Sequence, residues 1–321
     1  MRKIGCLGLL VALLLASALV VLRGWDGPGP AATPLTVTIR EGTTLAGAAQ
    51  QLARVGAIRS ATRFRYYAKM FGSAAPIRAG EYRLAAHASA ADVLATLQGG
   101  RTVQRLVTIP EGLPSVMVHD LLARTTVLTG TAAIPPEGSV LPDSYAVQPG
   151  DTRAGVLARM SRAMTTTLAA AWAERRPGIA VKTPAEAVIL ASVVEKETGK
   201  ASERAMIAAV YGNRLRLGMP LQADPTVIYP VTHGRPLGRR ILQSELHAKN
   251  GYNTYASPGL PKGPICNPGR ASIEAVLAPA VSNALYFVAD GSGGHAFATT
   301  LDQHNANVRR WYALRRSRGE M

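Results

Sequence analysis

The chain has 321 residues, of which 47% are hydrophobic and 17% charged. This length and composition exclude a disordered protein and allow two or three domains with cores of their own. The net charge of +16 favours polyanionic partners such as anionic lipid, the peptide carboxylates of a cell wall or nucleic acid.

The N-terminal segment predicts a membrane anchor. Two basic residues, Arg2 and Lys3, precede an apolar run over residues 4–22, which has about the length needed to cross a bilayer. Ala16-Ser17-Ala18 resembles a signal-peptidase site, but the run continues past it, which favours a retained span over a cleaved signal peptide. The positive-inside rule places the N-terminus in the cytoplasm and everything after Arg23 outside the membrane, where nucleic acid is generally not available.

A strand–helix–helix–strand unit is predicted behind a linker rich in glycine and proline, residues 24–34. Its strands are expected at residues 35–39 and 80–84. The helices expected in this region cover residues 45–55, 61–71 behind Ser60 as N-cap, and 90–97 behind Ser89.

The opening of this unit recurs further along the chain. Residues 37–42 (VTIREG) return as residues 107–112 (VTIPEG), and each copy leads into a helical pattern. Two strand-to-helix openings therefore share one design. A unit of this size and element order resembles a LysM-type module, and that resemblance implies glycan binding. Residues 125–153, rich in glycine, proline, threonine and serine, are predicted to be a loop, and helical patterns resume over residues 154–175.

These elements predict the fold class α+β and four segments. Residues 1–23 are the cytoplasmic tip and transmembrane helix, and residues 24–34 are the linker. Residues 35–124 form the small LysM-like α/β subdomain or subdomains. Residues 125–321 form a larger mixed α+β catalytic domain with a basic C-terminal tail.

The helix predicted over residues 184–197 combines clear end signals with an apolar body. Thr183 is an N-cap, Glu186 is placed to close a capping box, and Gly199 is a stop signal. Residues 187–194 are apolar nearly all round, which is typical of a helix buried inside a domain.

Two carboxylates, Glu195 and Glu197, stand at the C-terminal end of this helix. At about 100° per residue, Glu197 projects within about 20° of Leu190, whereas Glu195 points about 140° away. Burial raises the pKa of a carboxyl group, and the helix C-terminus acts in the same direction. Glu197 is therefore a candidate general acid for a glycosidic oxygen. The alternative is that both glutamates are solvated or paired with a basic neighbour such as Lys196, Lys200 or Arg204.

Four ordered sequence blocks follow from this helix to residue 305. They are LASVVEKET (190–198) with ASER (201–204), NRL (213–215) with LQADPTVIY (221–229), YNTY (252–255) with GLP, GPI and NPG (259–269), and YFVADG (286–291) with GHAF (294–297) and HN (304–305). In this order the blocks closely resemble the signature of the YceG-like endolytic murein transglycosylases.

That resemblance implies an enzyme that cleaves the bond between N-acetylmuramic acid and N-acetylglucosamine within nascent glycan strands. The product is a 1,6-anhydromuramyl end, and no water is consumed. Glu197 is implied as acid and then base, with Glu195 in support, because the muramic 6-hydroxyl is the nucleophile and replaces the second carboxylate of ordinary glycosidases.

The partners implied are peptidoglycan strands, the inner membrane that holds the single-pass anchor, and peptidoglycan synthases. Nucleic acid and cofactors are not expected. Side chains expected to contact the sugars are those of Glu195, Asn213, Gln222, Asp224, Tyr229, Asn253 and Tyr255. For the Asp224 and Asn253 segments, turn structure is an equally good explanation.

Three other functions are compatible with parts of the sequence. His233, His247, His295 and His304 could be metal ligands, but none has the close paired spacing of a zinc site, so no metal is expected. Cys266 lies in a proline-rich turn without an evident base for a nucleophilic thiol. The more serious alternative is a non-catalytic tether that binds peptidoglycan through the LysM-like unit.

Overall fold

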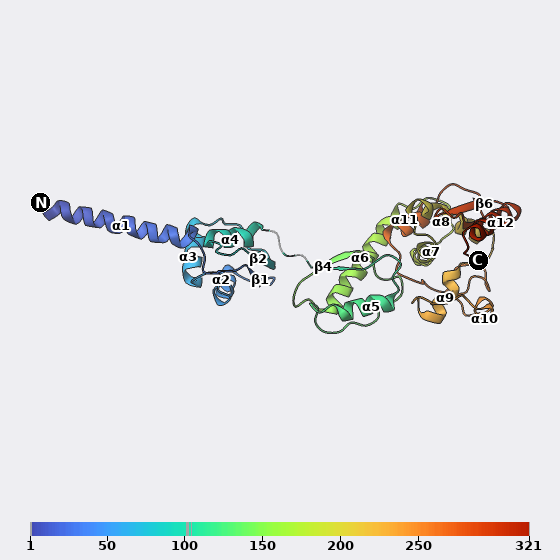
Figure 1. Cartoon of the computed structure of the whole chain (residues 1–321), viewed down its shortest axis with the longest axis horizontal. Helices are drawn as coiled ribbons and strands as arrows, with labels where there is room; N and C mark the ends of the chain where they lie inside the picture. Colours follow the sequence, from blue (N-terminus) through green and yellow to red (C-terminus); the bar gives the residue numbers. More distant parts are fainter. Residues whose placement is uncertain (1, 101–102, 104, 321) are drawn as a thin grey trace. The chain divides into compact units, whose positions relative to one another are not determined.

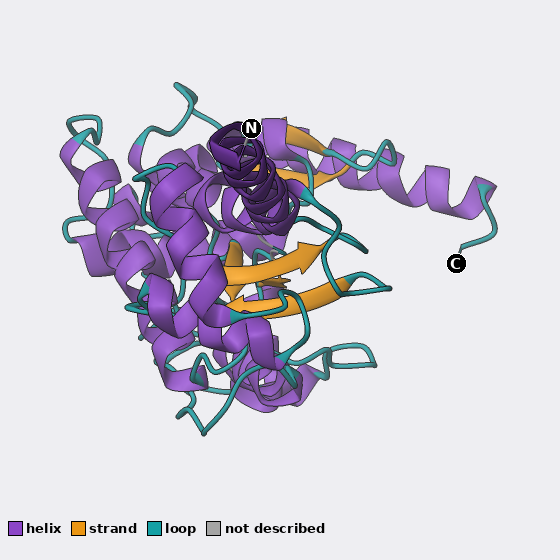
Figure 2. Ribbon diagram, turned by 90° about the vertical axis from the view of Figure 1, so that its left-hand side faces the viewer, coloured by secondary structure: helices purple, strands orange, loops and turns teal. Residues whose placement is uncertain are grey.

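A computed structural model describes residues 2–100, 103 and 105–320, and the side chains of these residues from position 12 onward. The chain divides into two compact units, Met1–Arg105 and Leu106–Met321. Helices dominate both units, and the strands of the described residues form three two-stranded sheets (Figure 1 and Figure 2). The predicted α+β class is confirmed.

The first unit contains the predicted strand–helix–helix–strand order. Strands β1 (Leu35–Ile39) and β2 (Gly80–Leu84) pair antiparallel and match the predicted ranges. Helices α2 (Leu45–Arg54), α3 (Ala61–Phe71) and α4 (Ala90–Gly99) pack on them around a core that includes Phe64 and Tyr82. Ser60 caps α3 by accepting a hydrogen bond from the Arg63 N–H, as expected.

Helix α1 (Arg2–Asp26) extends into the segment that was expected to be a linker. Trp25 is only 7% exposed and packs against Tyr67 and Phe71, because its large indole completes the first unit's core. Among the residues searched, none of the helices combines the length and apolar character needed to cross a membrane. The predicted span over residues 4–22 includes residues 4–11, whose side chains lie outside the described set.

The second unit begins within β3 (Arg105–Thr108) and continues with α5 (Ser115–Arg124), β4 (Ser144–Val147) and α6 (Arg153–Ala173). The loop predicted over residues 125–153 therefore contains a strand, and β4 pairs with β3. Val107 and Leu122 share a core with Val147 and Met160. This packing places residues 106–124 with the second unit, whereas the sequence pattern grouped them with the first.

The remainder of the second unit surrounds the predicted buried helix. Its elements are α7 (Pro184–Glu197), the 3₁₀ helix η1 (Ala201–Glu203), α8 (Arg204–Arg216), α9 (Asp224–Thr232), α10 (Gln243–Leu246), α11 (Arg270–Leu277), β5 (Tyr286–Ala289), β6 (His295–Ala298) and α12 (Leu301–Ser317). Helix α7 packs against α8 and α11, and Leu190, Val193 and Val194 are buried there. Strands β5 and β6 form an antiparallel hairpin beside α8 and α12.

The ends of α7 follow the predicted signals with two local differences. Thr183 Oγ1 accepts from the Glu186 N–H at 3.1 Å, but the Glu186 carboxylate accepts from the Lys182 N–H, one residue before the expected partner. The helix ends at Glu197 because Thr198 takes an extended backbone conformation, so the stop precedes Gly199.

Candidate active site

Glu197 is the last residue of α7 and carries a buried, unpaired oxygen. Its Oε1 has no hydrogen-bond partner within the described part of the chain. Burial raises the pKa of Glu197 to about 7, and the negative charge of Asp224 adds to this rise, while Tyr211 and Arg214 oppose it. Such a carboxyl is substantially protonated near neutral pH, as a general acid must be.

Tyr211 and Arg214 lie one helical turn apart on α8 and face this carboxyl. Tyr211 is 1% exposed, and burial and the adjacent Glu197 raise its pKa. Arg214 is 7% exposed and donates from Nε to the Leu285 carbonyl at 2.6 Å and from Nη1 to the Leu221 carbonyl at 2.8 Å. The guanidinium is thus held rigidly as a positive charge beside the acid.

Sequence reasoning did not single out Tyr211 or Arg214. Both lie in a helix whose residues 207–212 are buried on every side, so its pattern gives no polar face to search. The available signal was their spacing of three residues, which aligns two polar side chains on one face of an otherwise buried helix.

Three of the predicted sugar-contacting residues gather around Glu197 and Arg214. Gln222 is exposed, has a left-handed backbone (φ 56°), and accepts from Arg214 Nη1 at 3.2 Å. A left-handed glutamine is strained and marks a position of functional interest. Tyr255 donates from its hydroxyl to Asp224 at 2.6 Å, and the charges of Asp224 and Glu197 help burial to raise the pKa of this tyrosine.

Asn213 and Asn253 were expected to contact sugar, but their amides are used inside the protein. Asn213 Nδ2 donates to the carbonyls of Ser282 and Ala284, both at 2.9 Å. Asn253 is 3% exposed, and its Nδ2 donates to three carbonyls within residues 245–248. Each asparagine therefore stabilises a loop rather than presenting a free amide.

Glu195 lies on a different side of the helix end and is fully engaged. Its side chain is 6% exposed, its Oε2 accepts from the Gly269 N–H at 2.9 Å, and its Oε1 lies 3.6 Å from Arg204 Nη2. Gly269 is the N-cap of α11, so Glu195 fastens the end of α7 to the start of α11. Both carboxylate oxygens of Glu195 are thus engaged within the protein.

Tyr229 belongs to a second, half-buried polar group. Its hydroxyl donates to Glu137 Oε2 at 3.2 Å, and its ring packs against Tyr252 with centroids 4.9 Å apart. Glu137 also accepts from the Ser115 N–H at 2.8 Å and from Asn267 Nδ2 at 3.3 Å, and burial raises its pKa. Glu137 was not singled out because a lone glutamate in a loop carries no pattern.

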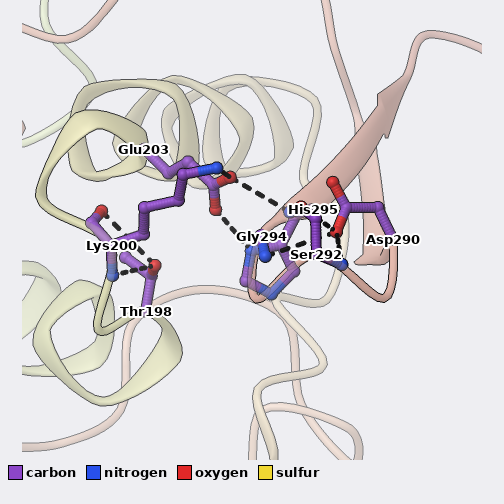
Figure 3. A network of polar contacts seen from close by, with 7 residues as sticks. All are labelled: Thr198, Lys200, Glu203, Asp290, Ser292, Gly294 and His295. Carbon is purple, nitrogen blue, oxygen red and sulfur yellow. Dashed lines mark hydrogen bonds and ion pairs between the residues drawn. The ribbon is translucent and has the colours of Figure 1, made fainter.

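The other residues considered as chemical groups have structural surroundings. Within the side chains that the structure describes, no three or more histidine, cysteine or acidic residues are grouped so that they could hold a metal ion. Cys266 is buried, and burial raises the pKa of its thiol, which disfavours the nucleophilic thiolate. His295 pairs instead with Glu203, Nδ1 to Oε2 at 2.7 Å (Figure 3).

Known proteins resemble this chain over most of its length. An endolytic murein transglycosylase of Bacillus subtilis is 28% identical over 305 residues, which cover 85% of this chain and 83% of the relative. Another, from Streptococcus pneumoniae, is also 28% identical over 85% of this chain, which spans little more than half (58%) of that relative's length.

The fold has a counterpart among solved structures. A crystal structure of a protein described as YceG-like, from Listeria monocytogenes, matches with a TM-score of 0.54 and 27% identity, covering 85% of this chain and 98% of the other. The model of the YceG-like family matches residues 37–310, which include Glu197 and its surroundings. The chain therefore belongs to the YceG-like family.

Proposed function

We propose that this chain is an endolytic murein transglycosylase. It cleaves the bond between N-acetylmuramic acid and N-acetylglucosamine within peptidoglycan strands and leaves a 1,6-anhydromuramyl end. The observation that carries the proposal is the buried, unpaired Oε1 of Glu197, whose carboxyl has a pKa of about 7. The names of the bacterial relatives support the same reaction.

One carboxyl group is sufficient for this reaction. Protonated Glu197 gives its proton to the glycosidic oxygen as the bond to the muramic anomeric carbon breaks. The muramic 6-hydroxyl oxygen then bonds to that carbon, and its proton returns to Glu197, so the acid is regenerated without water. Between these transfers the carboxylate is stabilised by Arg214, whose charge favours the ionised form of Glu197.

The chemical identity of the new ends tests the proposal. Purified protein is incubated with uncrosslinked glycan strands, and the products are analysed by mass spectrometry. We expect internal cleavage with anhydromuramyl ends, each one water lighter than a hydrolysed reducing end. Hydrolysed ends would contradict the proposed chemistry. Binding to strands without any cleavage would favour the alternative of a peptidoglycan tether.

We further propose that α1 anchors the protein in the inner membrane with the folded units outside the cytoplasm. Its support is the apolar run over residues 4–22 and the exposure of Leu14, Leu15 and Val20, which are 62%, 66% and 66% exposed. Membrane fractions washed with alkaline carbonate should retain the chain, and loss of the protein into the wash would contradict the anchor. Peptidoglycan synthases in that membrane are the partners we would test by crosslinking.

A further inference from the structure

A polar cluster joins the turn after the catalytic helix to the β5–β6 hairpin. Figure 3 shows the side chain of Glu203, which follows that turn, directed toward His295 at the start of β6. Thr198 caps the turn, with its Oγ1 accepting from the Lys200 N–H at 2.9 Å. Lys200 lies only three positions after Glu197, so this cluster holds the segment that leaves the active site.

Glu203 uses both carboxylate oxygens on the hairpin. It is 8% exposed, its Oε1 accepts from the His295 N–H at 3.1 Å, and its Oε2 lies 2.7 Å from His295 Nδ1. Lys200 Nζ lies 3.4 Å from Oε1. Burial alone would raise the pKa of Glu203, but the bonds from His295 and Lys200 lower it, so the carboxylate is ionised at neutral pH.

The hairpin approaches Glu203 so closely that a side chain at Gly294 would displace the Glu203 carboxylate and the Lys200 ammonium group. A Cβ at Gly294 would lie 2.3 Å from Glu203 Oε1 and 2.8 Å from Lys200 Nζ. The tip itself is shaped by Asp290, whose Oδ1 accepts from the N–H groups of Ser292 and Gly294 at 2.8 and 3.3 Å. Asp290 therefore shapes the hairpin tip, and the tip lies in close contact with Glu203 and Lys200.

A second path connects His295 to the catalytic carboxyl through aromatic packing. The His295 ring meets Phe287 edge to face, with centroids 5.2 Å apart, and Phe287 meets Tyr211 in the same way at 5.8 Å. Tyr211 is the buried tyrosine beside Glu197. His295 is thus linked to the turn after α7 through Glu203, and to Tyr211 beside Glu197 through Phe287.

We propose that His295 and Glu203 are positioning residues for catalysis, which clamp the β5–β6 hairpin to the end of α7 and so hold Glu197 in a dry, fixed place. Neither residue touches the reacting sugar in this account. The proposal rests on the proposed function, because it assigns the clamp a role in the reaction of Glu197.

Two substitutions of the histidine separate its hydrogen bond from its packing. His295→Phe keeps a ring against Phe287 but removes the donor to Glu203, whereas His295→Asn keeps a donor near the place of Nδ1 and removes the ring. We expect His295→Phe to lower kcat by roughly tenfold to a hundredfold with little change in KM, because the acid is misplaced. His295→Asn should recover most of the loss.

The pH–rate profile shows whether the effect reaches Glu197. Groups facing this carboxyl are Tyr211, Arg214, Asp224 and Tyr255. When the clamp is loosened, water enters, and the raised pKa of Glu197 falls from about 7 toward its ordinary value. In His295→Phe the alkaline limb of the profile should therefore move to lower pH. An unchanged limb and unchanged kcat would overturn the proposal, as would equal damage from the two histidine substitutions.

A pair of glycine substitutions tests the same contact without removing any polar group. Gly294→Ala pushes a methyl group into Glu203, whereas Gly199→Ala, in the turn after α7, meets open space. We expect Gly294→Ala to reproduce the shifted alkaline limb of His295→Phe and Gly199→Ala to resemble the parent. Equal behaviour of the two alanine variants would count against the clamp.

Hydrogen exchange of the full chain tests the clamp independently of activity. In His295→Phe and Gly294→Ala, the segment from Val194 to Arg204 should exchange faster while the unfolding temperature stays close to that of the parent. Unchanged exchange would overturn the clamp even if the parent is active. If the parent forms no anhydromuramyl product but exchange increases as expected, the proposed function fails and the clamp stands as a structural contact.

Discussion

Glu195 and Glu197 lie two residues apart on the last turn of α7, but the two sides of that turn surround them differently. On one side, Glu195 is satisfied by the Gly269 N–H and by Arg204. On the other side, Oε1 of Glu197 is buried without a partner among the described residues, and its carboxyl has a pKa of about 7.

Two glutamates at one helix end therefore differ in role: Glu195 joins neighbouring helices, and Glu197 is the candidate acid. Glu195 is engaged by a backbone N–H and by the guanidinium of Arg204, and these contacts join the end of α7 to α11 and α8. For Glu197, burial outweighs the opposing effects of Tyr211 and Arg214, so the carboxyl keeps its proton up to about pH 7. The difference lies in the neighbouring residues. Glu195 meets the start of α11 and Arg204 at the start of α8, whereas Glu197 meets Tyr211 and Arg214 further along α8.

The largest expected effect is the loss of product release when Glu197, but not Glu195, is replaced by glutamine. Glu197→Gln removes the transferable proton and should lower the release of anhydromuramyl product by roughly a thousandfold or more. Glu195→Gln is the matched control, since it makes the same change in the same turn. Equal losses of product release in the two variants would contradict the different roles given to Glu197 and Glu195.

The same two substitutions should also differ in their effect on stability. The pKa of Glu197 is about 7 in the folded protein and near its ordinary value in the unfolded chain. Its proton therefore stabilises the fold fully below the unfolded pKa, and this stabilisation is lost as the pH rises through about 7. At pH 8, Glu197→Gln should be more stable than the parent by up to roughly 3 kcal/mol. Thermal unfolding at pH 5 and pH 8 measures this difference, and a gain that is equal at both pH values would contradict it.

Glu195→Gln is expected to weaken the fold instead. It replaces a charge-assisted bond to the Gly269 N–H by a neutral one and leaves Arg204 without one of its carboxylate neighbours. The free energy of unfolding should fall by roughly 1–3 kcal/mol, while product release stays within about tenfold of the parent. Denaturant unfolding and the product assay check both parts. Unchanged stability with lost activity would place Glu195 in the chemistry.

The smallest expected effect concerns the tyrosine beside Glu197. The Tyr211 hydroxyl favours the ionised carboxyl and so holds the pKa of Glu197 below the value that burial alone would produce. Tyr211→Phe should therefore move the alkaline limb of the pH–rate profile upward by less than about one pH unit. A downward movement would mean that the hydroxyl favours the protonated acid.

Local sequence signals predicted the elements of this chain better than they predicted its contacts. Strands β1 and β2 and the start of α7 follow from alternation and capping, which act within a few residues. Strand β4 was missed because four residues, Ser144–Val147, gain their order from pairing with β3, nearly forty residues earlier.

The same limit applies to the site. The direction of Glu197 follows from helix geometry, and resemblance identified the segments around it. Asn253 and Tyr255 could not be separated in the sequence, because the asparagine's three carbonyl partners and the tyrosine's bond to Asp224 are set by loop packing. Arg214 was overlooked because its position beside Glu197 depends on the packing of α8 against α7.

The protonation of Glu197 can be measured directly by ¹³C NMR of the side-chain carboxyl groups, with the resonance assigned by its absence from Glu197→Gln. We expect this carboxyl to titrate at about pH 7 in the full chain. Titration near the ordinary glutamate value, about 4.3, would show that the carboxyl is solvated or paired, and would contradict its role as the acid.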